Sequence, residues 1–483
     1  MKKRLLTSLV LVSSLLLTAA QAVDLIAIGT ISGNYEDFAT ETAFPLENGV
    51  PGNVLGGLGS GLAYAGGTTY LALPDRGPNA KAYNPLVDNT TSYIPRFHTL
   101  NLSLAPTADP VSGLPFTLTP MLTDTTLLSS SSPLTYGSGA ALGNQVDGVT
   151  PIGSGAPVLN GIDHTHYFTG RSDNFDPTKP STNPKNARLD PEGIRVSNDG
   201  QSVYVSDEYG PFVYEFDRRS GRRTRVFNLP TNLAATNLSA QGNIEIAGNT
   251  VGRIANKGME GLAITPDGRT LVGFMQANLE QDKKKSLRIV TIDLKSGDTH
   301  EYAYKLTDGS GVSEIVAIND HQFLVDERDG SGLGDTPLLT DVASAATVKK
   351  LFLIDLAGAT DVTAIAGPNA DLSAYAVSKT LFLDVVAKLT AAGIEARLIP
   401  SKIEGVAFGQ DVVINGETRH TLFIANDNDF LATVADPFKQ PGDATRGLIA
   451  NPNKFFVFAF ADSELPGFVP QKFKRTRSDD CRD

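Results

Sequence analysis

Short stretches in which apolar and polar residues alternate recur along the chain, most clearly in 189–221, LDPEGIRVSNDGQSVYVSDEYGPFVYEFDRRSG. Alternation with a period of two predicts three strands here, over 193–197, 202–206 and 212–217. The Asn-Asp-Gly run between the first two is typical of a tight hairpin turn. Glu192 stands just before the first strand, and Asp207 and Glu208 follow the second. Antiparallel pairing therefore brings three carboxylates to one end of this hairpin.

The same hairpin pattern occurs four more times along the chain. Three of the other copies also begin with a glutamate, and the earliest has serine in its place; the five starting residues are Ser60, Glu192, Glu260, Glu314 and Glu404. Charged residues follow the second strand in most copies, namely Asp75 and Arg76, Asp207 and Glu208, Asp326 with Glu327 and Arg328, and Asp427. The copy that begins at Glu260 has Phe274 and Met275 at the corresponding place.

Repeats of about 40 to 60 residues with about four strands each are typical of a β-propeller. The 46 glycines, 28 prolines and absence of tryptophan also favour an all-β fold with many turns. We predict a β-propeller with five visible blades and favour six. The sixth would come from 123–186 or from an N-terminal strand paired with C-terminal strands. A β-sandwich is the alternative, but it does not require the same Glu-Gly entry in several copies.

Two insertions interrupt the repeats within a predicted propeller domain at 23–465. Residues 123–187 are rich in Ser, Gly, Asn, Asp and Pro, which indicates a long loop that is either a surface excursion or a functional lid. Residues 371–393 predict a helix on the outside of the sheets, ended by Gly393. Its apolar face would contain Tyr375, Leu381, Val385, Val386 and Leu389. Residues 466–483 form a polar tail.

The N-terminus has the pattern of a secretory signal peptide. Basic residues at 2–4 precede an apolar run at 9–17 and a small-residue site that predicts cleavage after about Ala22. No cysteine follows that site until Cys481, the one cysteine of the chain, so an internal disulfide is excluded. We expect a periplasmic or secreted protein whose stability comes from its apolar core.

The charge balance limits the partners. The formal net charge is −12, and removal of the three basic residues at 2–4 takes it to −15. An acidic exported protein is a poor candidate for binding nucleic acid or anionic membranes, and a reasonable one for binding hard cations. We expect a monomer that acts on a small anionic or ester substrate.

In a propeller, the start of each first strand and the end of each second strand lie at the same channel mouth. Carboxylates crowded there repel one another unless protons or a cation neutralise them. With no nearby cysteine and few histidines, oxygen ligands favour Ca²⁺, with Mg²⁺ possible. The candidate ligands are Glu192, Glu260, Glu314, Glu404, Asp75, Asp207, Asp326 and Asp427. Alternatively, each glutamate bonds backbone amides of the neighbouring blade as a structural latch.

Four further residues are candidates for catalysis. Arg76 and Arg328 stand at similar places after the second strands of their copies, where guanidinium groups would hold an anionic substrate. Glu208 and Glu327 lie beside them as candidate catalytic carboxylates. The alternative is that each arginine pairs with an adjacent carboxylate.

One histidine pair falls in the long loop. His164 and His166 would share a face of a strand near Asp163 and Asp173, which suggests a second metal site or an acid–base pair. The chain contains no GxSxG, HExxH or GxxxxGK[ST] motif. The absence of the first argues against an ordinary lipase or esterase fold.

Four segments together, LDPEGIRVSNDGQSVYVSDEYGPFVYEFD, NKGMEGLAITPDGRTL, PDRGPN and KIEGVAFG, resemble the phytase-like family of exported bacterial proteins, named for "esterase-like activity of phytase". The resemblance covers about 57–460. It implies a β-propeller and, through more distant similarity to β-propeller phytases, calcium-dependent hydrolysis of phosphate esters. In that chemistry the metal polarises phosphoryl oxygens and activates water, while basic residues absorb developing charge. The missing Lys/Arg-rich cleft argues against inositol hexakisphosphate as substrate.

Three functional hypotheses follow. The first is metal-dependent hydrolysis of phosphate esters. The second keeps the propeller and metal but changes the bond to a lactone or carboxyl ester, as in the similar six-bladed lactonases whose ligands also begin Glu-Gly motifs. The third is a non-catalytic binding propeller in which Ca²⁺ is structural.

Overall fold

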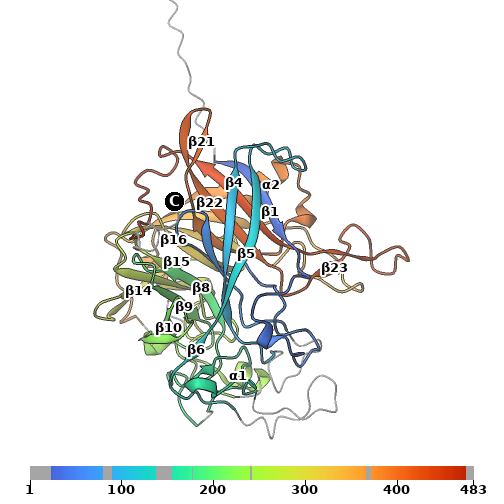
Figure 1. Ribbon diagram of the computed structural model, residues 1–483. Coiled ribbons are helices and arrows are strands. Elements are labelled where there is room, and N and C mark those ends of the chain that lie inside the picture. Colours follow the sequence, from blue (N-terminus) through green and yellow to red (C-terminus); the bar gives the residue numbers. More distant parts are fainter. Residues whose placement is uncertain are drawn as a thin grey trace, which may run out of the picture.

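Five four-stranded antiparallel sheets form the protein in the computed structural model (Figure 1). The structure describes residues 23–79, 90–137, 155–176, 178–239, 242–365 and 371–474. The predicted signal peptide at 1–22 and the end of the tail with Cys481 lie outside the described residues.

Each sheet is one blade, and in blades 1 to 4 the strands follow one another in chain order from the innermost outward. Blade 1 contains β2 (Gly61–Tyr64), β3 (Thr69–Leu73), β4 (Arg96–Ala105) and β5 (Thr117–Leu127). Blade 2 contains β8 (Pro191–Val196), β9 (Ser202–Asp207), β10 (Phe212–Asp217) and β11 (Arg223–Asn228). Blade 3 contains β12 (Met259–Ile264), β13 (Thr270–Met275), β14 (Ser286–Asp293) and β15 (Thr299–Lys305). Blade 4 contains β16 (Gly311–Ala317), β17 (Gln322–Arg328), β18 (Lys349–Asp355) and β19 (Lys379–Asp384).

Blade 5 joins the two ends of the propeller domain. Its strands are β20 (Lys402–Phe408), β22 (Glu417–Asp427), β25 (Asn453–Phe460) and, outermost, the N-terminal β1 (Asp24–Ile31). Figure 1 shows the blue β1 beside the orange and red strands of this blade. A short strand, β21 (Val412–Ile414), extends β22 as a hairpin.

The ring closes with five blades. The innermost strands β2, β8, β12, β16 and β20 contact one another in this order, and β20 contacts β2 again. The predicted β-propeller is confirmed, but the favoured count of six is corrected to five. The N-terminal strand does pair with a C-terminal strand, yet it completes the fifth sheet. The loop at 123–187 supplies the end of β5 and a small sheet of β6 (Ser129–Ser130) and β7 (His166–Tyr167), while 138–154 lies outside the described residues.

Apolar side chains fill the spaces between neighbouring blades. Successive residues of a strand point to opposite faces of its sheet. In blade 3, Leu262 packs toward blade 2, whereas Ala263 packs toward blade 4. Five such clusters lie between successive pairs of blades. Burial of apolar surface, at about 25 cal/mol per Å², therefore holds the ring together without a covalent crosslink.

The predicted outer helix at 371–393 is shorter than expected. A 3₁₀ turn, η4 (Leu372–Tyr375), is followed by strand β19, and α2 (Val385–Ala391) begins only after it. Pairing with β18 satisfies the backbone groups of 379–384, which overrides the helical spacing of the apolar residues. Asp384 caps α2 by accepting a hydrogen bond from the Ala387 amide, and Gly393 follows the helix with φ +87°.

The remaining elements are short. They are α1 (Gly242–Gly248), η1 (Thr40–Thr42), η2 (Ile162–His164), η3 (Thr231–Leu233), η5 (Ala396–Leu398), β23 (Thr433–Ala435) and β24 (Leu448–Ala450). Among the helices in the described part of the chain, none has the length and apolar character needed to cross a bilayer.

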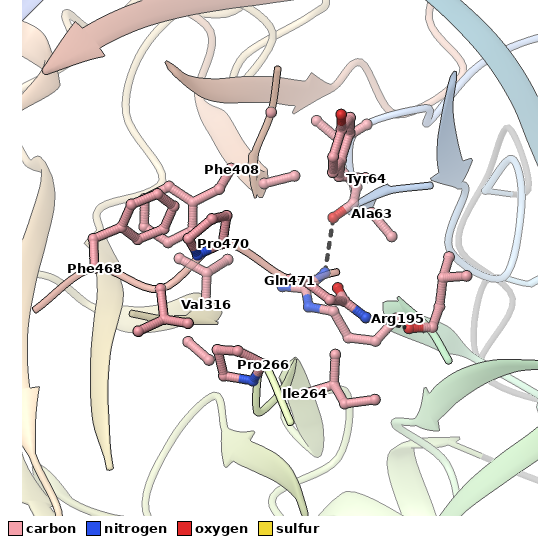
Figure 2. A pocket seen from close by; sticks show the side chains of 16 residues that line it. Ala63, Tyr64, Arg195, Ile264, Pro266, Val316, Phe408, Phe468, Pro470 and Gln471 are labelled. Atoms are coloured by element: carbon pink, nitrogen blue, oxygen red, sulfur yellow. Dashed lines mark hydrogen bonds between the residues drawn. The ribbon is translucent and has the colours of Figure 1, made fainter. Parts of the chain in front are cut away.

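The first part of the predicted polar tail is packed against the propeller. Phe468 stacks on Phe408, with ring centroids 4.4 Å apart, and Gln471 donates a hydrogen bond to the Val196 carbonyl. The segment crosses the end of the channel formed by the C-terminal ends of the innermost strands. Figure 2 shows it around a small apolar cavity that also contains Arg195.

Candidate functional site

A β-bulge recurs at the start of the innermost strands. In blades 3 and 5 the extra residue is Glu260 or Glu404, and in blade 2 the irregularity includes Glu192. In blade 4 the bulge falls between Val312 and Glu314, so that Ser313 is the extra residue. Because a bulge re-aims the extra side chain, it determines which residue of each copy points to the channel mouth.

The strand registers then define equivalent positions in the five blades. Gly261 pairs with Phe274, Gly405 with Ala425, and Glu314 with Asp326. Glu314 therefore occupies the position at which blades 3 and 5 have glycine. The residues that precede this position, which we call entry positions, are Ser60, Glu192, Glu260, Ser313 and Glu404. The residue of the second strand that pairs with the glycine position is followed, two residues later, by what we call the exit position. The five exit positions are Asp75, Glu208, Gln276, Arg328 and Asp427.

The entry and exit positions surround one acidic cavity of about 240 Å³ at the channel mouth. All five exit residues and all entry residues except Ser60 line it. Its charged lining consists of six carboxylates and four basic side chains, namely Asp75, Glu192, Glu208, Glu260, Glu404 and Asp427 with Arg76, Lys257, Arg328 and Lys402. The predicted ring of carboxylates around one mouth is thus present, with basic residues among them.

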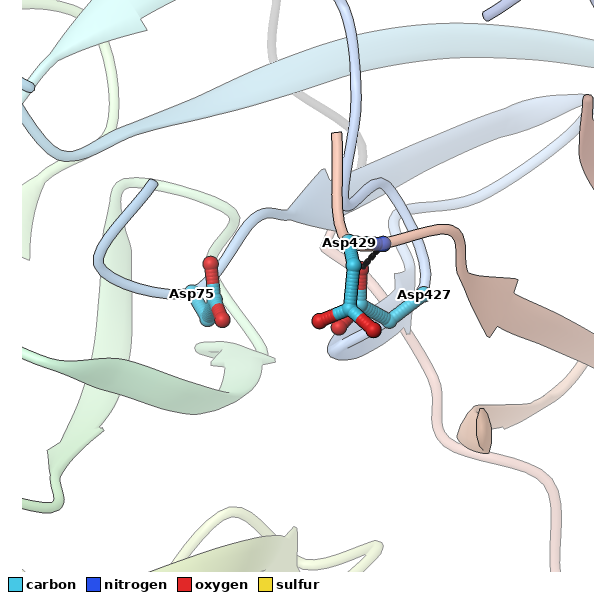
Figure 3. Close-up of side chains that lie close together, drawn as sticks. All are labelled: Asp75, Asp427 and Asp429. Atoms are coloured by element: carbon cyan, nitrogen blue, oxygen red, sulfur yellow. Dashed lines mark hydrogen bonds between the residues drawn. The ribbon is translucent and has the colours of Figure 1, made fainter. Parts of the chain in front are cut away.

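The first carboxylate cluster consists of Asp75, Asp427 and Asp429, which offer oxygens within 4.8 Å of one another. Figure 3 shows Asp427 and Asp429, from the end of β22 and just beyond it, on the side opposite Asp75. The Lys402 ammonium lies 2.8 Å from Asp427 Oδ2 and also bonds Asp429. Burial, followed by the charge of Asp427, raises the pKa of Asp75 well above its usual value. This cluster therefore has one internal cation for three acids.

The second carboxylate cluster consists of Asp190, Glu192 and Glu208, again with oxygens within 4.8 Å of one another. Arg76 Nη1 lies 2.9 Å from Asp190 Oδ2, and the amide of Gly258 donates to Glu208 at 2.9 Å. Within the described residues, no hydrogen bond reaches the carboxylate of Glu192. Burial and the neighbouring acids raise the pKa of Glu192 well above normal and that of Glu208 to about 8.

Glu260 and Glu404 share Arg328 on the other side of the cavity. Arg328 Nη2 bonds Glu404 and lies 3.7 Å from Glu260 Oε1, while Gln276 donates to Glu260 at 2.7 Å. Burial is the largest cause of a raised pKa in both glutamates, and the acids around them add to it. The cavity therefore contains more buried negative groups than its basic side chains neutralise.

Four residues that were predicted to belong to the site do not line the cavity, and this assignment is corrected; they are Asp207, Glu327, Glu314 and Asp326. Asp207 accepts hydrogen bonds from the amides of Asp190, Tyr209 and Gly210, as a latch within its own turn. Glu327 points between blades 3 and 4, where it bonds the Tyr304 hydroxyl at 2.6 Å.

Glu314 and Asp326 also point away from the mouth. Glu314 Oε1 accepts from the amides of Leu262 and Ile315, so the latch alternative describes it. Both oxygens of Asp326 are buried and lack a hydrogen-bond partner among the described residues, and burial raises its pKa to about 8. In blade 4 the glutamate follows the bulged residue instead of occupying it, which explains why the sequence alignment of the copies misplaced both acids.

The two arginines line the cavity but are not equivalent. Arg328 stands at an exit position and corresponds to Asp75, whereas Arg76 follows one residue later. Arg76 pairs with Asp190 and Arg328 pairs with Glu404, not with the carboxylates adjacent to them in sequence. Both guanidinium groups therefore already have carboxylate partners.

Sequence reasoning missed several residues of the site, and three of them belong to its charged clusters. Asp190 and Lys402 each lie two residues before an entry glutamate, and Asp429 lies two residues after an exit aspartate. Alternation along an extended chain places residues two apart on the same side, which is the signal that would have identified them.

The histidine pair does not form a site with its predicted partners. Asp163 and His164 are in a 3₁₀ turn with φ of 50° and 56°, not on a strand, and both are exposed. Asp173 is buried and bonded by Arg171 at 2.5 and 2.7 Å. The turn separates His164 from the strand face of His166.

Comparison with known proteins identifies the family of the chain. A sequence model described as "Phytase-like: Esterase-like activity of phytase" matches residues 53–430. The chain belongs to this phytase-like family. The phytase-like chain is also similar to a protein of Arthroderma benhamiae described as "Uncharacterized secreted protein", at 28% identity over 327 residues. The match covers 58% of this chain and 60% of that relative, so the chain spans less than two thirds of the relative's length.

Two solved structures illustrate the structural likenesses of the phytase-like chain. A periplasmic gluconolactonase of Pseudomonas aeruginosa has 12% identity and a TM-score of 0.30, with 90% of this chain and 99% of that chain covered. A gluconolactonase of Xanthomonas campestris has 10% identity and a TM-score of 0.30, with 92% and 99% covered. At these scores the likenesses carry no inference, and the propeller rests on its own sheet topology.

Proposed function

We propose that this phytase-like protein is an exported hydrolase of ester bonds that requires a divalent cation, Ca²⁺ before Mg²⁺, with phosphate esters as its first substrate class. The observation that carries the proposal is the pair of three-carboxylate clusters, each with two members that line the same cavity at the channel mouth. The family description adds support, because it names an esterase-like activity.

The residues of the second carboxylate cluster fit a hard cation. They offer oxygen atoms, which Ca²⁺ and Mg²⁺ prefer, and Glu192 contributes a carboxylate whose charge the neighbouring acids oppose. In the first cluster, Lys402 bonds two of the three acids, whereas in the second cluster Arg76 bonds only Asp190. We therefore place the ion at Asp190, Glu192 and Glu208, and we withdraw Glu314, Asp207 and Asp326 from the ligand set.

The bound cation would supply a Lewis acid for the ester oxygens and a lowered pKa for an attacking water. Arg76 and Arg328 would orient anionic oxygens of the substrate, each held in place by its carboxylate partner. Glu260, whose pKa is raised by burial and which Gln276 holds in place, would serve as the general acid for the leaving oxygen. The exposed Lys257 would attract anionic substrates to the mouth.

A second substrate class, lactones or carboxyl esters, has its own support. Arg76, Arg328 and Lys402 are each paired with carboxylates, so a doubly charged phosphate would have to compete for them. A neutral ester does not need a free guanidinium group. The same cation would serve either bond.

One set of assays separates these functions from a non-catalytic propeller. Mature protein is treated with chelator, its metal content is measured, and phosphomonoester, phosphodiester, carboxyl ester and lactone substrates are tested with and without added Ca²⁺. We expect calcium-dependent hydrolysis that is lost in Glu192→Gln and kept in the exposed control Glu417→Gln. Activity that is unaffected by chelator would refute the role of the metal. Absence of activity on every substrate, together with a thermal midpoint that falls on chelation, would favour a structural cation.

A further inference from the structure

Two side chains depart from the repeat, and each is the partner of the other. Arg195 stands where the other innermost strands carry small apolar residues, Ala63, Ala263, Val316 and Ala407. Glu314 stands where the others carry glycine, Gly61, Gly193, Gly261 and Gly405. Arg195 Nη2 lies 3.0 Å from Glu314 Oε2, and the two side chains are 7% and 1% exposed. We call them the axial pair.

The axial pair contacts the innermost strand of every blade. Arg195 donates hydrogen bonds to four backbone carbonyls, those of Leu62 at 2.8 Å, Ile194 at 2.5 Å, Ile315 at 2.9 Å and Val406 at 3.5 Å. Glu314 Oε1 accepts from the backbone amide of Leu262 at 3.0 Å and from its neighbour Ile315 at 2.9 Å. The registers place these five residues at the same level of β2, β8, β12, β16 and β20.

The unpaired backbone groups of the innermost strands explain the position of the axial pair. Each innermost strand is the edge of its sheet, so its unpaired backbone groups face the channel and need partners. A guanidinium has five donors and can serve several carbonyls at once. Added Cβ atoms at Gly193 and Gly261 would meet backbone nitrogens at 2.7 and 2.9 Å. A Cβ at Gly61 would likewise lie 2.5 Å from the Glu192 carbonyl oxygen, so three of the four glycine positions exclude a side chain, whereas blade 4 carries Glu314 at this position.

We infer that Arg195 and Glu314 act as a positioning pair, which fixes the relative positions of the five innermost strands that carry the acidic cavity. The entry residues Glu192, Glu260 and Glu404 each stand two residues before a backbone group that the pair holds. A shift of one innermost strand would therefore move a carboxylate. The consequence for cation binding rests on the proposed function, whereas the link between the five blades does not.

The test compares the axial pair with a buried ion pair that lies away from the innermost strands. Arg288 on β14 is fully buried and bonds Asp282 at 2.6 Å and Glu301 of β15 at 2.8 Å. Arg288→Met therefore breaks a buried charge pair of similar cost without touching the axis. Arg195→Met, Glu314→Gln, their double variant and Arg288→Met are compared by hydrogen–deuterium exchange and by calorimetric titration with Ca²⁺.

We expect Arg195→Met to speed amide exchange in the innermost strands of all five blades and to weaken Ca²⁺ binding at least tenfold. Arg288→Met should speed exchange in the outer strands of blade 3 and around Val362 and Ile365, which Arg288 also bonds, but not in the innermost strands, and it should leave the Ca²⁺ affinity within twofold. The double variant should lose less thermal stability than the sum of the single variants, because the two groups act as a unit. Exchange confined to blade 2 in Arg195→Met would overturn the inference.

Two outcomes keep the inference separate from the proposed function. If Arg195→Met does not fold, Glu314→Gln, which keeps an acceptor for the Leu262 amide, must still speed exchange in more than one blade, and a failure to do so overturns the inference. If the unmodified protein binds no Ca²⁺, the proposed function fails, and the exchange pattern alone decides whether the pair links the blades.

Discussion

The two ends of the channel are built from the same five strands but differ in chemistry. At the N-terminal ends of the innermost strands, the acidic cavity holds six carboxylates with four basic side chains. At the C-terminal ends, a small cavity is lined mainly by apolar groups such as Val316 and Phe408, and the tail covers it with Phe468 (Figure 2). Arg195 and Glu314 lie between the two ends.

The difference separates stability from function. Apolar burial at the tail end stabilises the fold whether or not a ligand is present. Buried carboxylates at the mouth repel one another and cost stability until protons or a cation neutralise them. The five innermost strands are therefore well packed at one end and destabilised by carboxylate repulsion at the other. This arrangement is expected of a binding site on a rigid scaffold.

The largest expected effect comes from Glu192→Gln at the mouth. Glu192 is the acid of the second cluster without a hydrogen-bond partner among the described residues, so loss of its charge removes a cation ligand. Hydrolysis should fall about 100-fold or more, as measured by kcat/KM with saturating Ca²⁺. In chelator the variant should melt at a higher temperature than the unmodified protein, because one repulsive charge is gone. A lower melting temperature in chelator would contradict this account of the mouth.

The next effect is the pH dependence of stabilisation by Ca²⁺. The pKa of Glu208 is raised from 4.5 to about 8, so the folded protein binds protons more tightly than the unfolded chain does. This contribution to stability is fully present below about pH 4.5 and is lost as the pH rises through about 8. Differential scanning calorimetry should show that the increase in melting temperature on adding Ca²⁺ grows from pH 5 to pH 8, to roughly 5 °C or more. A constant increase across this range would contradict the prediction.

A smaller effect is expected at the tail end. Phe468 is half-buried and packs against Phe408 and Phe460, with ring centroids 4.4 and 5.5 Å away. Phe468→Ala should lower the free energy of unfolding by about 2 kcal/mol, measured by denaturant titration. Its affinity for Ca²⁺ should match that of the unmodified protein, since the two ends are separated by the axial pair. A parallel loss of Ca²⁺ affinity would show that the ends are coupled.

The smallest effect is expected for the exposed Lys257 at the rim. Lys257→Ala should raise the KM for an anionic substrate two- to fivefold at low ionic strength and leave a neutral ester unaffected, because the lysine acts through long-range attraction. The difference should disappear at about 0.5 M salt. Persistence at high salt would indicate direct contact with the substrate.

The sequence was sufficient for the hairpins and the propeller, because alternation and turn residues are local signals. It also located most of the mouth, including Glu192, Glu260, Glu404, Asp75 and Asp427. It failed at blade 4, where the bulged residue at the entry position is Ser313 and Glu314 follows it, pointing into the channel. Bulge placement depends on which strands pair and how the blades pack, so a single sequence does not specify it.

The blade count failed for a related reason. The pattern alone does not say whether β1 opens a new sheet or completes an existing one, and its pairing with β25 decides the matter. Likewise, the helical spacing at 371–393 is overridden over 379–384 by pairing with β18. Both errors concern contacts between residues far apart in sequence.

Calorimetric titration of chelator-treated protein with Ca²⁺ at pH 7 tests the central claim most directly. We predict saturable binding with a dissociation constant in the micromolar range or below, weakened at least tenfold in Glu192→Gln and unchanged in the exposed control Glu417→Gln. Absence of binding in the unmodified protein, or equal binding in Glu192→Gln, would contradict the claim that the acidic cavity is a cation site.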